Sequence, residues 1–127
     1  MTNEKELQTI EQGRAKYAFE CAQEGKKLSE ASKYKSYVKK TPMLIKNNGL
    51  GAAFAFIYQN KKEKPYELIY NQTYRWLSEY RKYVKKDEKN TLMAQLVSMS
   101  SEEYCKITNE VMALFNWLRR FVDAEIE

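Results

Sequence analysis

The side chains that could carry out acid–base or metal chemistry in this chain are few in type. Of its 127 residues, none is a histidine, two are cysteines and 17 are aspartates or glutamates. Without histidine the chain lacks the commonest general base at neutral pH and the commonest metal ligand. Catalytic triads and cysteine–histidine pairs are therefore excluded, as are zinc sites rich in histidine.

The two cysteines, Cys21 and Cys105, are too far apart in the chain for a CxxC redox motif or a paired zinc clip. Each falls on an apolar stripe, which predicts a reduced and buried thiol. The carboxylates have no Gly-rich loop or DxD spacing beside them of the kind that phosphate or metal chemistry uses. The sequence predicts no cofactor and no bound metal.

The basic residues are concentrated in the middle of the chain. The net charge is +5, and residues 26–89 hold sixteen bases against six acids, whereas residues 1–25 and 90–127 are both mildly acidic. The basic segment over residues 26–89 indicates a surface that faces a polyanion, because clustered basic residues are typical of nucleic-acid-binding proteins. The alternative is a lysine-rich face in solvent, and charge alone does not decide between the two.

The elements that must position these bases are helices. With four glycines, two prolines and no run of strand-like alternation, the sequence predicts one all-helical domain over residues 1–127. The longest apolar stretch, residues 50–58, is nine residues long, whereas a membrane span needs about 20. Because Met1 leads directly into polar residues, we expect a cytoplasmic protein without a signal segment.

The spacing of apolar residues predicts a compact bundle of about six helices. The first runs from Asn3 to Gln23 and ends near Gly25, with a stripe formed by Leu7, Ile10, Arg14, Tyr17 and Cys21. A second helix capped by Ser29 is expected to break near Thr41, because the residue before a proline disfavours helical angles. Pro42 then opens a short helix over residues 43–47.

The second half of the chain follows the same logic. Residues 50–58 are apolar all round and predict a buried central helix, and Pro65 opens the next helix after a polar loop. The inner face of that helix is expected to hold Tyr66, Ile69, Thr73, Trp76, Leu77, Tyr80 and Val84. After a polar loop over residues 87–90, a short helix covers residues 92–97. Ser100 caps the last helix in a capping-box pattern.

Two segments, residues 32–40 and 78–86, share six of nine positions. Both are expected to be helices whose tyrosines and valine pack inward while the bases project outward near the C-terminal end. Bases at that end also complement the helix dipole, which requires no ligand. The ten tyrosines could stack on nucleobases, but most fall on apolar stripes, so core packing is favoured.

Several phrases of the sequence resemble a known family. They are residues 14–18, residues 34–51 with the following Phe54-Ala-Phe56, and residues 109–125. In order and spacing they are similar to the small all-helical subunit of the type III-B CRISPR effector, the Cmr complex. The most specific phrase is Lys-Asn-Asn-Gly-Leu-Gly at residues 46–51, which precedes the apolar helix. Residues 61–91 carry little family signal.

The resemblance implies a non-catalytic subunit. Members of the family form helical bundles that stack in several copies beside the backbone subunits holding the guide RNA. Their basic face lines the groove where target RNA pairs with the guide, so the expected partners are other Cmr subunits, copies of the chain itself and the guide RNA–target RNA duplex. We expect contacts to phosphates rather than to base edges. The candidate RNA-binding residues are Lys35, Lys39, Lys40, Lys46, Arg81, Lys82, Lys85, Lys86, Arg14 and Lys16.

Neighbouring copies also need a contact surface. Arg119, Arg120 and the acidic residues Asp123, Glu125 and Glu127 are expected to meet a basic face of the next copy, in a contact that propagates rather than closes. Two alternatives come from other classes of function. One is a helical protein–protein adaptor that does not contact RNA. The other is a small carboxylate-dependent nuclease, for which the sequence shows no converging acids.

Overall fold

The computed structural model describes the backbone of residues 4–87 and 89–127 and the side chains of residues 9–87 and 89–127. The helices in chain order are α1 (Glu4–Lys26), α2 (Ala31–Asn48), α3 (Leu50–Gln59), α4 (Lys64–Arg75), the π-helical turn η1 (Trp76–Tyr80), α5 (Leu92–Ser98) and α6 (Ser101–Glu125). No strand occurs among the described residues, so the predicted all-helical bundle is confirmed. No helix in the described part of the chain is long and apolar enough to cross a membrane.

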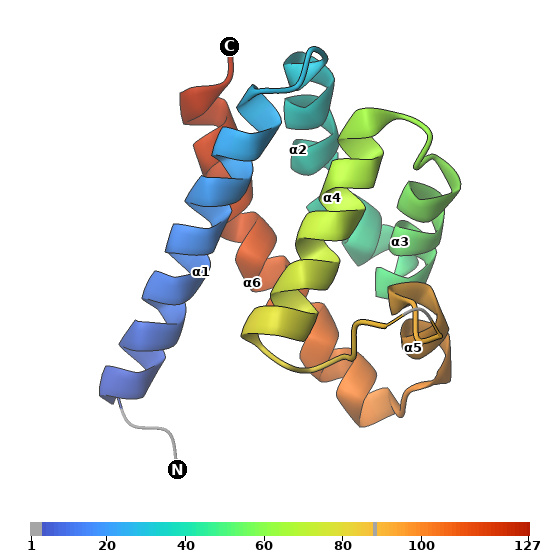
Figure 1. Ribbon diagram of the computed structural model, residues 1–127. Coiled ribbons are helices and arrows are strands. Elements are labelled where there is room, and N and C mark those ends of the chain that lie inside the picture. Colours follow the sequence, from blue (N-terminus) through green and yellow to red (C-terminus); the bar gives the residue numbers. More distant parts are fainter. Residues whose placement is uncertain (1–3, 88) are drawn as a thin grey trace.

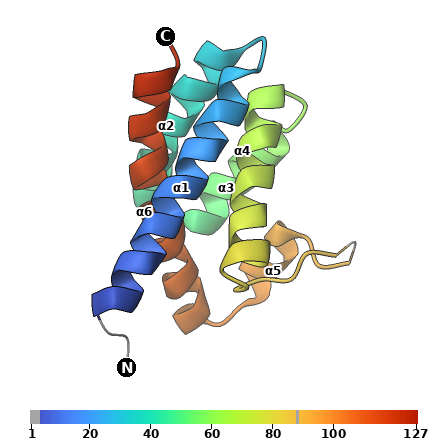
Figure 2. The same cartoon turned by 60° about the vertical axis from the view of Figure 1, so that its left-hand side comes forward.

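The first and last helices form the longest pair of the bundle. α1 packs most extensively on α6, and the two run in the same direction side by side (Figures 1 and 2). α2 lies on α6 in the opposite direction, because Lys35 near its start contacts Ile126 at the end of α6, whereas Lys46 near its end lines a groove with Met112 farther back along α6. α3 and α4 pack against α2, and α5 packs on α3. α6 is therefore the helix on which both chain halves meet.

Three polar side chains of the core, Tyr17, Tyr34 and Gln72, are linked by hydrogen bonds. The hydroxyl of Tyr34 on α2 donates to Gln72 Oε1 at 2.7 Å, and the amide of Gln72 donates to the backbone oxygen of Cys21 at 3.1 Å. Tyr17 on α1 donates to the backbone oxygen of Gln72 at 2.6 Å. These bonds tie α1, α2 and α4 together inside the core, where unpaired polar groups would be costly. Cys21 is buried, as predicted, whereas Cys105 is exposed and its expected burial is wrong.

The predicted start of the first helix at Asn3 and the side chain of Leu7 lie outside the described residues. α1 ends at Lys26, one residue beyond the predicted stop, so Gly25 lies in its last turn and does not cap it. A Cβ atom placed at Gly25 would lie 2.0 Å from the ring of Tyr34. The glycine is therefore explained by the close approach of α2 rather than by the end of the helix.

The predicted break near Thr41 is also wrong, because α2 continues through Pro42 to Asn48. Proline removes one backbone hydrogen bond from a helix interior. Burial on both sides of it, at Thr41 and Ile45, holds the helix together, and Thr41 Oγ1 donates to the backbone oxygen of Tyr37 at 2.8 Å. The helix begins after Glu30 rather than at a Ser29 cap.

α3 is buried along one face only. Leu50, Ala53, Phe54 and Ile57 are buried, as the apolar sequence predicts. Phe56, however, is 43% exposed and packs edge-on against Tyr66, so its expected full burial is wrong. An apolar helix of this composition can bury one side and still leave the other side uncovered.

The two similar segments adopt different structures. Residues 32–40 are helical within α2, whereas the helix that holds Ser78 ends at Tyr80 in the π-helical turn. The chain then forms an irregular segment, with Lys82 in the left-handed region at φ 56°. Tyr74 and Gln95 bond the backbone of this segment, which the local sequence does not reveal. The expectation of two equivalent helices is therefore wrong.

The predicted cap of the last helix is confirmed, since Ser100 Oγ accepts from the Glu103 amide at 3.2 Å.

Candidate nucleic-acid interface

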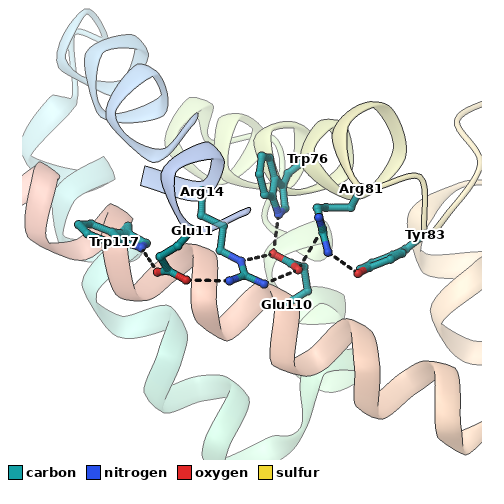
Figure 3. Close-up of polar contacts among 7 residues, drawn as sticks. All are labelled: Glu11, Arg14, Trp76, Arg81, Tyr83, Glu110 and Trp117. Carbon is teal, nitrogen blue, oxygen red and sulfur yellow. Dashed lines mark hydrogen bonds and ion pairs between the residues drawn. The ribbon is translucent and has the colours of Figure 1, made fainter. Parts of the chain in front are cut away.

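Two of the candidate bases, Arg14 and Arg81, converge on one buried carboxylate (Figure 3). Glu110 on α6 is 4% exposed. Its oxygens accept hydrogen bonds from Arg14 Nε at 2.8 Å and Arg14 Nη2 at 2.9 Å, and from Trp76 Nε1 at 3.0 Å. Arg81 Nε lies 3.1 Å from Glu110 Oε1. Arg14 thus forms a two-pronged pair, the strongest geometry for an arginine and a carboxylate.

The electrostatics of this cluster keep Glu110 ionised. Burial by itself would raise the pKa of Glu110, but hydrogen bonds from Arg14 and Trp76, together with the charges of Arg14 and Arg81, outweigh it and lower the pKa below its usual value. Arg14 also bonds Glu11, and Arg81 donates to the Tyr83 hydroxyl at 2.6 Å. The two guanidinium groups therefore hold α1, η1 and α6 together and present little free charge to a ligand.

Lys35, Lys39 and Lys40 gather on the first half of α2, beside the end of α6. Lys39 Nζ lies 2.8 Å from Asp123 Oδ1 and Lys35 Nζ lies 3.7 Å from the same oxygen. Lys35 also donates to the backbone oxygen of Ile126 at 2.8 Å. A shallow hollow of about 460 Å³ here is lined by the three lysines together with Ser32, Ser36 and Glu127. We call this the α2 patch.

Lys46 lies farther along α2 and is exposed. It lines a groove of about 280 Å³ between α2 and α6. Arg119 and Asn116 line the same groove, so the structure joins a predicted RNA-binding residue to one expected to face a neighbouring copy. Spacing within one helix could not show this, because the two bases come from different helices.

Lys82, Lys85 and Lys86 lie in the irregular segment after η1, which we call the basic loop (residues 81–87). Its backbone is fixed: the Lys85 amide donates to Gln95 Oε1 at 2.8 Å, and the Gln95 amide donates to the Lys85 oxygen at 2.6 Å. Lys86 lies 3.7 Å from Glu79. Among the described residues, Lys82 and Lys85 form no ion pair, although the charge of Lys85 acts on nearby Asp87. Lys106 of α6, which the charge pattern of the sequence does not single out, lies 4.6 Å from the centre of the Tyr83 ring.

The structure does not bring the α2 patch and the basic loop together. Lys39 contacts α6 at Asp123, whereas the basic loop meets α6 near Lys106. These positions are 17 residues apart, which corresponds to about 26 Å along a helix. Figures 1 and 2 likewise show the start of α2 and the loop before α5 at opposite ends of the bundle. Lys16 lines a cavity together with Trp76, Tyr80 and Arg81, the first residue of the basic loop.

Two of the three C-terminal acids, Asp123 and Glu125, already have partners within the chain. Asp123 pairs with Lys39, and Glu125 accepts a hydrogen bond from Gln23. The hydrogen bond from Lys39 lowers the pKa of Asp123. Arg119 and Arg120 are exposed. Within the described residues, no group of three or more cysteine, aspartate or glutamate side chains is arranged to hold a metal ion.

Comparisons with known proteins agree over nearly the whole chain. A family model described as "CRISPR-associated protein (Cas_Cmr5)" matches residues 10–125. The CRISPR system Cmr subunit Cmr5 of Thermus thermophilus is 29% identical over 126 residues, covering 95% of this chain and 99% of that protein. A crystal structure of a CRISPR-associated Cmr5 family protein from the same organism superposes with a TM-score of 0.77 at 26% identity, covering 92% of this chain and 96% of the other.

Proposed function

The chain belongs to the Cmr5 family of CRISPR-associated proteins, and on that basis we propose that it is a non-catalytic subunit of a Cmr complex that supports guide RNA–target RNA pairing. In this role several copies stack beside the backbone subunits, and their bases contact the phosphates of the paired strands. The family model also matches residues 61–91, a segment whose sequence motifs show little resemblance to the family.

The proposal that the chain binds RNA rests on the exposed lysines and the hydrogen-bonded backbone of the basic loop. Lys82 and Lys85 are exposed and form no ion pair among the described residues, and Gln95 and Tyr74 fix the backbone of the loop at Lys85. A fixed backbone with free ammonium groups suits contacts to phosphate, which position a strand without reading its sequence. Lysine provides a point charge for such contacts, without the forked geometry of arginine.

The α2 patch offers a second set of phosphate contacts, in competition with Asp123. Exposed ion pairs such as Lys39–Asp123 contribute only about 0–1 kcal/mol, so an RNA phosphate can replace the carboxylate at little cost. Arg14 and Arg81 are left out of the proposed contacts because Glu110 engages both. The groove formed by Lys46 and Arg119 is open to either RNA or a neighbouring copy.

The test is a charge reversal in the basic loop. Complexes carrying Lys82→Glu and Lys85→Glu should assemble on guide RNA and capture target RNA more weakly. For the isolated protein, removal of each phosphate contact should flatten the log–log dependence of affinity on salt by about 0.7–0.9. Lys64→Glu, at an exposed lysine at the start of α4, is the control and should change neither property.

The adaptor hypothesis gives the opposite result. If the reversed loop prevents assembly while the isolated protein binds RNA as before, these lysines contact protein, and the RNA-binding part of the proposal is wrong. Incubation of the purified protein with Mg²⁺ and single-stranded RNA addresses the nuclease alternative. RNA cleavage that a single Asp or Glu substitution abolishes would contradict a non-catalytic role.

A further inference from the structure

A cavity of about 340 Å³ lies between α1 and η1, apart from the α2 patch. The residues of α1 that line it include Gly13, Lys16 and Tyr17, and those that follow α4 include Trp76, Tyr80 and Arg81. Its volume falls in the range typical of small-ligand sites. Three of its lining residues, Tyr17, Trp76 and Tyr80, are aromatic.

The cavity holds a stack of aromatic rings with one exposed member. The rings of Trp76 and Tyr80 stack with centroids 5.4 Å apart and planes inclined by 25°. The ring of Tyr17 lies 4.9 Å from that of Trp76 and 4.8 Å from that of Tyr80. Tyr17 and Trp76 are buried, but Tyr80 is 54% exposed. Two buried rings thus hold an exposed third one in a fixed orientation.

The π-helical turn produces this arrangement. The Arg81 amide donates to the Trp76 oxygen at 3.0 Å across five residues, which widens the last turn of the helix. Such turns are rare and occur frequently at functional sites. Two residues after Tyr80, Lys82 takes a left-handed conformation that non-glycine residues seldom adopt. The exposed ring therefore stands at the start of the basic loop, directly before its lysines.

We propose that this cavity binds an unpaired base of a single-stranded RNA segment, with Tyr80 as the stacking platform. The proposal rests on the proposed function and specifies a second kind of contact for it. Lys16 at the cavity and Lys82 beyond Tyr80 supply charges for the phosphates on either side of the base. Aromatic rings beside lysines that follow a backbone are the combination by which proteins bind single strands without sequence preference.

Gly13 allows a test that leaves the rings untouched. A Cβ atom placed at Gly13 has no heavy atom within 4 Å, so Gly13→Leu adds a side chain to open space at the cavity wall. The probes are a short oligoadenylate, which has bases and charges, and inorganic polyphosphate, which has charges only. Gly13→Leu and Tyr80→Ala should each lower the affinity for oligoadenylate by about 5- to 150-fold, the range found for loss of one base–aromatic stack. Affinity for polyphosphate should not change.

Matched variants separate stacking from folding. Gly13→Ala and Tyr80→Phe should bind oligoadenylate like the wild type, because the first leaves the cavity open and the second keeps the ring. Phe19→Ala removes another exposed aromatic residue of α1 that lies away from the cavity, and it should also have no effect. In a Trp117→Phe background, the fluorescence of Trp76 should be quenched by oligoadenylate but not by polyphosphate.

The outcomes distinguish this inference from the function it rests on. If Gly13→Leu and Tyr80→Ala bind oligoadenylate like the wild type while Lys82→Glu weakens binding, the cavity takes no base and only the phosphate contacts stand. If the wild-type protein binds neither probe, RNA binding and the cavity proposal both fail. If the cavity variants alter self-association but not oligoadenylate binding, the cavity receives a neighbouring copy and the inference is wrong.

Discussion

Glu110 is the side chain on which α1, η1 and α6 converge. Replacing it with alanine leaves Arg14 without its two-pronged partner and the Trp76 indole N–H without an acceptor. Because breaking a buried ion pair strands the remaining charge, Glu110→Ala should lower the free energy of unfolding by about 3–5 kcal/mol. Urea denaturation measures this change. Glu79→Ala, which removes only an exposed partner of Lys86, should stay within about 1 kcal/mol of the wild type.

The same residue predicts a pH dependence. The pKa of Glu110 is lower in the folded chain than its ordinary value, so the folded state binds its proton less readily than the unfolded state does. Its contribution to stability is therefore complete above about pH 5 and is lost as the pH falls through the lowered pKa. The thermal midpoint of the wild type should fall with acidification more steeply than that of Glu110→Gln. Parallel curves would show that Glu110 does not control acid stability.

Removal of the Asp123 carboxylate is predicted to increase RNA affinity. Its carboxylate holds Lys39 at 2.8 Å and lies 3.7 Å from Lys35. Asp123→Asn should free the Lys39 ammonium and remove the negative charge beside Lys35, which still donates to the Ile126 oxygen. RNA affinity should rise, and the log–log salt dependence should steepen by about 0.7–0.9 per lysine that gains a phosphate. Glu67→Gln changes the net charge equally at the exposed pair with Lys64. If the two variants behave alike, the gain is a general charge effect and not a property of the α2 patch.

At the scale of the helix, α3 contains a matched pair of phenylalanines. Phe54 is fully buried, whereas Phe56 is half-exposed against Tyr66. Phe54→Ala should therefore cost about 3–5 kcal/mol, and Phe56→Ala should cost about 1 kcal/mol, since an aromatic pair contributes about 0.5–1.5 kcal/mol beyond its burial. Denaturant unfolding of both variants compares the two faces. Equal losses would mean that α3 is buried on both sides.

Sequence signals within one turn of a helix were correct at some positions and wrong at others, such as the expected cap at Ser29. The cap at Ser100 and the proline in the first turn of α4 follow from neighbouring residues and were predicted. The break predicted next to Pro42 is absent because burial of the surrounding residues outweighs the local preference for a break. The repeated segment misled because Gln95, outside it, fixes the second copy in a loop.

The candidate site shows the same division. Charge clustering in the sequence predicts Lys82 and Lys85 as RNA-binding residues, and in the described structure both are exposed without an ion pair. The pairing of Arg14 with Glu110 joins residues 96 positions apart, and no spacing rule reveals such a pair. The stack of Trp76 and Tyr80 depends on a π-helical turn, whereas helical periodicity placed both rings in the core. A positive charge on an apolar stripe, as at Arg14, was the one available sign of a buried partner.

For the molecule as a whole, two basic regions at opposite ends of α6 predict independent contributions to RNA binding. Free-energy changes from sites well separated in space usually add within about 0.3–0.5 kcal/mol. The losses caused by Lys39→Glu and Lys82→Glu should therefore sum in the double variant, as measured by fluorescence anisotropy with one RNA. If the double variant binds RNA as tightly as the weaker-binding single variant, both lysines act on one contact.

The side-by-side placement of α1 and α6 has a consequence for how the protein is made. A ribosome adds about 5–20 residues per second, so α1 emerges roughly 5–20 s before the part of α6 that pairs with Arg14. Throughout that interval the face of α1 that packs on α6 has no partner in the nascent chain. The bundle closes only when its last helix has been released, so a copy interrupted before residue 101 has no surface on which to complete its core.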